Sequence, residues 1–109
     1  MTYIESDWKI FRKRVPEWQE RYLTIKNQEI TKMLSDDRKT PTERFWEAKE
    51  QMKKDARILV DCFDGHSRGK MGWYLFLMHL HKVITDEDLV DFSDSLREEV
   101  FKSKNAFNR

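Results

Sequence analysis

Cys62 and His66 are the one pair in this sequence whose types and spacing suggest nucleophilic catalysis. A cysteine nucleophile needs a base within about 3 Å and an acid that orients the base. The two residues are four apart, and Asp61 and Asp64 lie nearby. Gly65 is expected to end a helix between them, however, and a lone cysteine beside apolar residues has the character of a small core residue. The sequence therefore predicts no enzyme activity and no catalytic residues.

Residues 65–70 resemble a phosphate-binding loop but depart from its pattern. The Walker motif places four residues between its glycines and follows them with Lys and then Ser or Thr. Here three residues separate Gly65 from Gly69, and Met71 stands where the hydroxyl that binds Mg²⁺ would be. We expect a helix-ending turn with exposed basic groups, and whether this loop has a function is left open.

The histidines are poorly spaced for a metal site. Ligands on a helix share a face when they are three or four residues apart. His79 and His81 are two apart and would point about 200° away from each other. The sequence therefore predicts no metal and no cofactor, and it implies no small-molecule ligand.

Two clusters of charge are candidates for binding. A candidate basic patch on the first helix consists of Lys9, Arg12, Lys13 and Arg14. Nucleic-acid association through this patch is the alternative function, although residues 1–34 mix seven basic with five acidic side chains. A candidate acidic face near the C-terminus consists of Asp86, Asp88, Asp91, Asp94 and Glu98. This face is either solvated or docked against the basic first helix, within the molecule or in a partner subunit.

Large aromatic side chains supply the third candidate, an interaction surface. It consists of Trp8, Phe11, Trp18, Tyr22 and Trp73. Trp and Tyr are favoured anchors in protein interfaces. The first four belong to a stripe that also contains Val15 and Ile25, with spacings that alternate between three and four. Such a stripe forms either the internal core or the seam of a homodimer.

The same stripe predicts a long first helix that ends near Leu34, before the turn formers that follow. Ser6 and Thr2 are the candidate N-caps. Pro16 lies inside the stripe, where its ring and its missing N–H break or kink a helix. Because the spacing continues through Pro16 without a change of phase, one kinked helix is favoured over two short helices.

A second helix begins with the clearest start signal in the chain. Thr40-Pro41-Thr42-Glu43 has the form of a capping box with proline at the first helical position. The expected buried stripe contains Phe45, Ala48, Met52, Ala56, Leu59 and Phe63, with Trp46 at one end. The expected outer face contains Glu43, Glu47, Glu50, Lys53, Lys54 and Arg57.

Two further helices complete the predicted fold. Residues 70–83 are apolar on almost every face, which predicts a buried central helix or one half covered by another subunit. Thr85 followed by three acidic residues predicts the start of the last helix, with Ile84 and Leu89 as a hydrophobic staple. That helix is expected to bury Phe92, Leu96 and Val100 or Phe101. The ordered core is expected to span residues 5–101, with a frayed tail over 102–109.

Composition limits the class of protein. The 109 residues are enough for one domain, and a net charge of +1 gives no strong field to steer the chain to DNA or membranes. The 38% of charged residues suggest disorder, but the 13% of aromatic residues supply a core. No apolar run approaches the roughly 20 residues of a membrane span. The single cysteine and the lack of an apolar signal core indicate a cytoplasmic protein.

Three stretches of the chain carry a resemblance to other proteins. They are residues 7–12 leading to 18–22, then 45–47, then 88–94. They resemble a group of small uncharacterised helical proteins from Gram-positive, often gut-dwelling bacteria, over roughly residues 5–101. The resemblance implies a bacterial cytoplasmic protein and brings no assigned site residues.

Together these observations predict an all-α domain, a compact bundle of four main helices. The predicted function is that of a small protein-interaction or regulatory module without catalysis. The partner is either a second copy of the chain or another protein.

Overall fold

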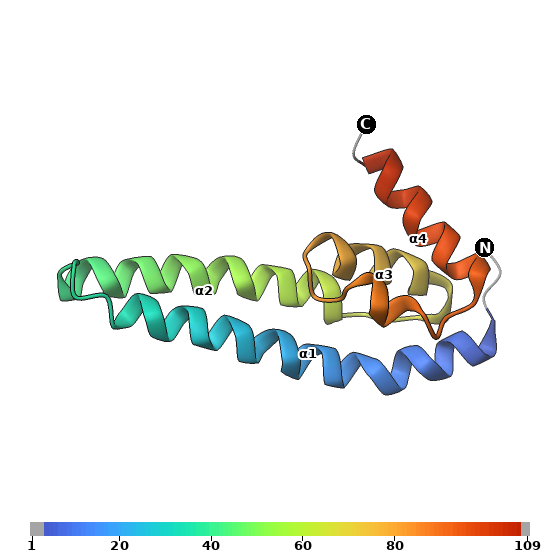
Figure 1. Ribbon diagram of the computed structural model, residues 1–109, viewed down its shortest axis with the longest axis horizontal. Coiled ribbons are helices and arrows are strands. Elements are labelled where there is room, and N and C mark those ends of the chain that lie inside the picture. The colour runs from blue at the N-terminus through green and yellow to red at the C-terminus, as the bar shows by residue number, and fades with distance from the viewer. Residues whose placement is uncertain (1–3, 108–109) are drawn as a thin grey trace.

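The computed structural model describes residues 4–107 and contains no strand among them. Four α-helices and two short 3₁₀ helices follow one another along the chain (Figure 1). They are α1 (Glu5–Leu34), α2 (Pro41–Phe63), η1 (Arg68–Lys70), α3 (Met71–Leu80), η2 (Asp86–Leu89) and α4 (Asp94–Phe107). The prediction of an all-α bundle with a long first helix is confirmed.

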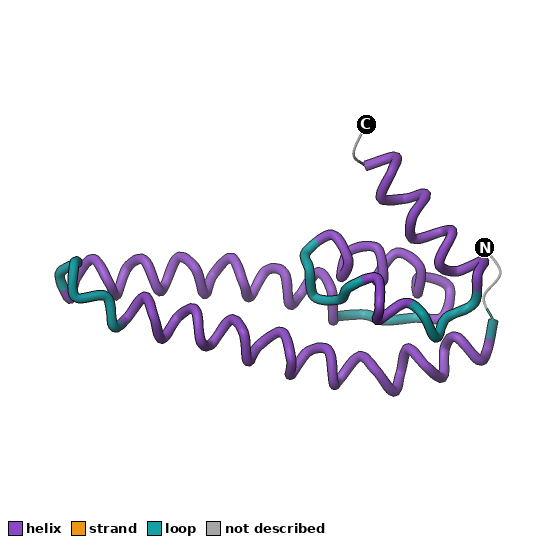
Figure 2. Tube along the Cα trace, viewed as in Figure 1, coloured by secondary structure: helices purple, strands orange, loops and turns teal. Residues whose placement is uncertain are grey.

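The bundle is elongated, with extents of 53 × 32 × 24 Å. Helices α1 and α2 form an antiparallel hairpin, and α3, η2 and α4 gather at one end of it (Figures 1 and 2). The other end of the hairpin, where α1 ends and α2 begins, projects as a two-helix arm that no other described element covers. No described helix combines the length and the apolar character that crossing a membrane requires.

Helix α1 continues through Pro16 as predicted, and its ribbon is bent (Figure 1). It ends at Leu34, also as predicted. The start differs from the expectation, because the carbonyl of Ile4 already accepts the N–H of Trp8 at 3.2 Å. Ser6 therefore lies inside the first turn and cannot cap the helix, and Thr2 lies outside the described residues.

The core lies at the covered end of the hairpin, around α3. Its fully buried side chains include Phe11, Met71, Leu75, Met78, Leu89 and Val100. Helix α3 is central as predicted but ends at Leu80, because the chain turns at Lys82 with φ of 61°. That left-handed residue lets the N–H of Val83 reach the carbonyl of Met78 at 2.8 Å.

The expected buried stripe of α2 is wrong over most of the arm. Ala48 is buried as predicted, but Phe45, Met52 and Trp46 are 56%, 55% and 53% exposed, and Ala56 is exposed as well. The side of α2 that faces inward carries Ala48, Asp55 and Cys62 instead. Since the arm has only two helices, α2 buries one narrow side against α1 and leaves the next side open. The six charged residues of the expected outer face are all exposed.

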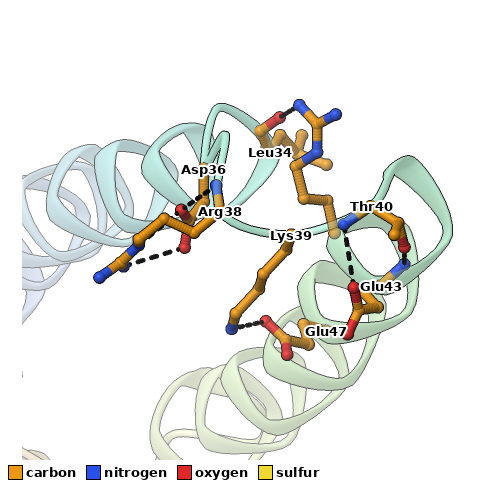
Figure 3. A network of polar contacts seen from close by, with 8 residues as sticks. Leu34, Asp36, Arg38, Lys39, Thr40, Glu43 and Glu47 are labelled. Carbon is orange, nitrogen blue, oxygen red and sulfur yellow. Dashed lines mark hydrogen bonds and ion pairs between the residues drawn. The ribbon is translucent and has the colours of Figure 1, made fainter.

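The turn that closes the arm is held by a network of polar contacts (Figure 3). The predicted capping box is confirmed, because the Glu43 N–H donates to Thr40 Oγ1 at 3.1 Å and the Thr40 N–H donates to Glu43 Oε1 at 2.9 Å. Arg44 donates to the carbonyl of Leu34 at 3.2 Å, and Lys39 pairs with Glu47. These bonds fix the turn between α1 and α2.

The predicted last helix is in fact two elements. Thr85 begins only the short η2, and α4 starts at Asp94 with the Ser93 hydroxyl accepting the N–H of Leu96 at 3.3 Å. Ser93, which caps the new helix start, also donates from its backbone N–H and its hydroxyl to Asp7 of α1. Ile84, Leu89, Phe92, Leu96 and Val100 are buried as expected. Helix α4 continues to Phe107, past the point at which a frayed tail was predicted.

Candidate functional site

Cys62 and His66 lie close together but lack the geometry of a nucleophile and its base. Nε2 of His66 is 2.7 Å from the backbone carbonyl oxygen of Cys62, an acceptor, so this nitrogen donates to the main chain. The thiol is fully buried. Burial, with a smaller contribution from Asp61, raises the pKa of Cys62 to about 12. The thiol therefore stays protonated at neutral pH and is a poor nucleophile.

Among the described residues, no group of three or more His, Cys, Asp or Glu side chains is placed to hold a metal ion. His79 pairs instead with Asp86, with 2.6 Å between Nε2 and Oδ1, and the edge of its ring packs against Phe101.

The predicted aromatic interaction surface is largely internal. Trp8, Phe11, Trp18 and Tyr22 are buried in the core cluster with α3, and only Trp73 is exposed. The four side chains are buried because the stripe faces the helices that gather at the covered end of the hairpin. The spacing allowed either an internal core or a dimer seam, and within one chain these four side chains form part of the core.

The acidic face docks partly within the molecule. Asp88 accepts two hydrogen bonds from Arg21, at 3.0 and 2.7 Å, and Asp91 accepts one from Arg14 at 3.1 Å. Thus η2 and the residues after it are fastened to α1 by opposite charges. The other three members remain exposed: Asp86 pairs with His79, Asp94 with Arg97, and Glu98 lies in solvent.

Of the predicted basic patch, Lys9, Arg12 and Lys13 are exposed and line one open hollow of about 420 Å³. Arg14 is directed elsewhere, to Asp91 and to Glu17. The hollow gains a fourth cation from Arg68, whose guanidinium donates to both carboxylate oxygens of Glu5 at 3.3 Å. Arg68 is 54 or more residues away from this patch in the sequence, and tertiary packing brings it to the hollow.

A second candidate surface lies on the arm, and the sequence assigned those of its residues that belong to α2 to the core. We call it the arm surface and define it as Leu34, Phe45, Trp46, Met52 and Ala56. The rings of Phe45 and Trp46 meet nearly at right angles, with their centroids 5.1 Å apart. Lys49 Nζ lies 5.1 Å from the centre of the Trp46 ring. Exposed apolar side chains that share one helix face, as Phe45, Met52 and Ala56 do by their spacing, mark interaction sites more often than single exposed residues do.

Comparison with known proteins adds no further constraint. No family model matches the chain, and neither the curated proteins nor the solved structures yield a significant match.

Proposed function

We propose that the protein is a non-catalytic interaction module whose arm surface binds an amphipathic helix of another protein. The proposal rests on one observation, namely that the apolar side chains of α2 in the arm are open to solvent although their spacing is that of a buried stripe. The cytoplasmic location and bacterial origin suggested by the sequence belong to this proposal.

The exposed area supports a protein partner. A large aromatic side chain buries about 150–250 Å² when covered, so Phe45 and Trp46, each half exposed, present on the order of 200 Å². Met52 and Leu34 are about equally exposed and extend the surface. Aromatic anchors of this kind dominate binding energy in protein interfaces. A helical partner fits because Phe45, Met52 and Ala56 are spaced seven and four apart, the spacing of one helix face.

The charges beside the arm surface indicate the chemistry of the partner. Lys49 is four residues from Phe45 and three from Met52, so it lies on the same side of α2, and Lys53 follows one turn later. Neither lysine forms an ion pair within residues 4–107, although Lys49 contacts the Trp46 ring. A second copy of the chain would present the same lysines beside its own arm surface. A partner with acidic residues beside its apolar face would neutralise them.

A photo-crosslinking amino acid at position 52 tests the proposal in cells. Lys54 provides the matched control, because residues two apart on a helix point about 200° away from each other. We expect adducts with one other protein from position 52 and none from position 54. Equal adducts from both positions, or none from either, would contradict the proposal.

The crosslinked protein is then purified and its affinity measured. Met52→Glu is expected to weaken binding at least tenfold, because it places a charge in the apolar contact and opposite acidic residues, whereas Lys54→Glu leaves affinity unchanged. Sedimentation at several concentrations identifies the alternative partner. A wild-type dimer that dissociates on Met52→Glu would show that the arm binds a second copy and would overturn the assignment of another protein.

A further inference from the structure

The end of the hairpin opposite the arm carries a concentration of positive charge that the net charge of the chain conceals. The hollow of about 420 Å³ there is lined by Glu5, Trp8, Lys9, Arg12, Lys13 and Arg68. It therefore holds four cationic side chains and one carboxylate, while the whole chain carries only +1. Like charges that converge on a concave surface raise the local potential and favour an anion.

The neighbouring charges show why three of the four cations, those on α1, remain available. Arg14 and Arg21 on the same helix are neutralised by Asp91 and Asp88. Lys9, Arg12 and Lys13 form no ion pair within residues 4–107 and are exposed. These three cations can therefore pair with an anionic ligand from solution.

Glu5 and Trp8 position the fourth cation. The guanidinium of Arg68 donates to both oxygens of Glu5 and lies 5.3 Å from the centre of the Trp8 ring. These contacts hold η1 against the start of α1. The indole Nε1 of Trp8 is buried and has no hydrogen-bond acceptor among the described residues.

A second hollow of about 400 Å³ adjoins the first, because Trp8 and Arg12 line both. Its other walls are Phe11, Val15, Pro16 and His66. These are apolar or flat groups, and the His66 ring is held by its bond to the Cys62 carbonyl and by edge contacts with Phe11 and Tyr74. A basic compartment and a flat apolar compartment thus share one wall.

We infer that the paired hollows bind a nucleotide unit. Its phosphate lies among Lys9, Arg12, Lys13 and Arg68, and its base lies against the wall formed by Val15, Pro16 and His66. Three cations without an ion pair among the described residues, beside the Arg68 guanidinium that Glu5 holds, suit a group that carries two or more negative charges, and a base supplies the flat apolar surface that the second hollow covers. The unit is either a free nucleotide or part of a single strand, since both present the same phosphate and base. This site is separate from the arm surface and does not depend on the function proposed for it.

Titration of the ¹⁵N-labelled full chain at low salt with ADP, pyrophosphate and a ten-residue oligothymidylate tests the inference. We expect ADP to shift the indole N–H signal of Trp8 and the backbone signals of residues 8–16, with an affinity that falls as salt rises. Pyrophosphate is expected to bind at least tenfold more weakly, because it lacks the base. If the oligothymidylate binds more tightly than ADP, the ligand of the site is a single strand. If ADP binds more tightly, the ligand is a free nucleotide.

The variant Arg12→Gln/Lys13→Gln tests the residues. We expect it to weaken ADP binding at least tenfold, whereas Lys53→Gln/Lys54→Gln on the arm removes the same charge and leaves binding unchanged. Both pairs are exposed, and circular dichroism checks that each variant folds. No saturable shift with millimolar ADP, equal weakening in both variants, or pyrophosphate binding as tight as ADP would each overturn the inference.

Discussion

The carboxylate of Asp7 accepts two hydrogen bonds from Ser93, one from the backbone N–H at 2.8 Å and one from the hydroxyl at 2.5 Å. Asp7 lies in the first turn of α1 and Ser93 directly before α4, so a single buried group joins two elements at opposite ends of the chain. The Ser93 hydroxyl in turn accepts the N–H of Leu96 and caps α4.

Asp7→Ala is therefore expected to destabilise the fold. Removing the carboxylate leaves the Ser93 donors in a partly buried position without their acceptor, which costs about 1–3 kcal/mol in the free energy of unfolding. Urea denaturation measures the loss. Glu20→Ala, an exposed change on the same helix, is the control and should shift stability by less than about 0.5 kcal/mol. Equal effects of the two changes would show that the contact with Ser93 contributes little.

The pair of Arg21 and Asp88 predicts a dependence of stability on pH. Partial burial raises the pKa of Asp88, but hydrogen bonds from Arg21 and Thr85 outweigh it, so the pKa lies below its ordinary value of 3.8. A carboxyl whose pKa is depressed in the folded state stabilises the fold above its unfolded pKa, and that contribution is lost as the pH falls through its folded pKa.

We therefore expect Asp88→Asn to be less stable than the wild type at about pH 6 and to approach it at about pH 3. Urea denaturation across this range checks the prediction, with the exposed turn residue in Asp37→Asn as the control. A deficit in Asp88→Asn that does not change with pH would contradict an ionic contribution.

Burial of Cys62 predicts a protected thiol. Because its pKa is raised to about 12 by burial, and further by Asp61, little thiolate exists at pH 8. Iodoacetamide should leave the folded protein unmodified over hours and label it rapidly in denaturant, as read by mass spectrometry. Fast labelling of the folded chain would show that Cys62 is accessible and ionised.

Truncation of two phenylalanines to alanine should change the stability of the fold by very different amounts. Phe11 is 1% exposed, and Phe11→Ala is expected to cost about 3–5 kcal/mol because it opens a cavity in the core. Phe45 is more than half exposed, and Phe45→Ala should change stability by less than about 0.5 kcal/mol. Thermal and urea denaturation of the two variants compare them directly. A large loss for Phe45→Ala would mean that the arm surface is covered in solution.

The sequence by itself determined the local structure wherever the signal is contained in one turn of helix. The capping box at Thr40 and Glu43 forms as predicted, because its two hydrogen bonds join residues three apart. The first helix continues through Pro16, since six large side chains keep one phase on both sides of the proline. The alternation of three and four residues also marked Trp8, Phe11, Trp18 and Tyr22 as one face, but not whether that face is core or interface.

Tertiary structure decided what each face meets. Phe11 and Phe45 belong to stripes of similar spacing, yet the first is buried and the second exposed, because α3, with α4 packed against it, lies at only one end of the hairpin. Ser93 at the start of α4 is held by Asp7, 86 residues away, and Arg68 reaches Glu5 in the basic hollow from 63 residues away. Hydrogen bonds and ion pairs of this range arise only when the chain has packed, since nothing in the local sequence indicates which distant group will be close.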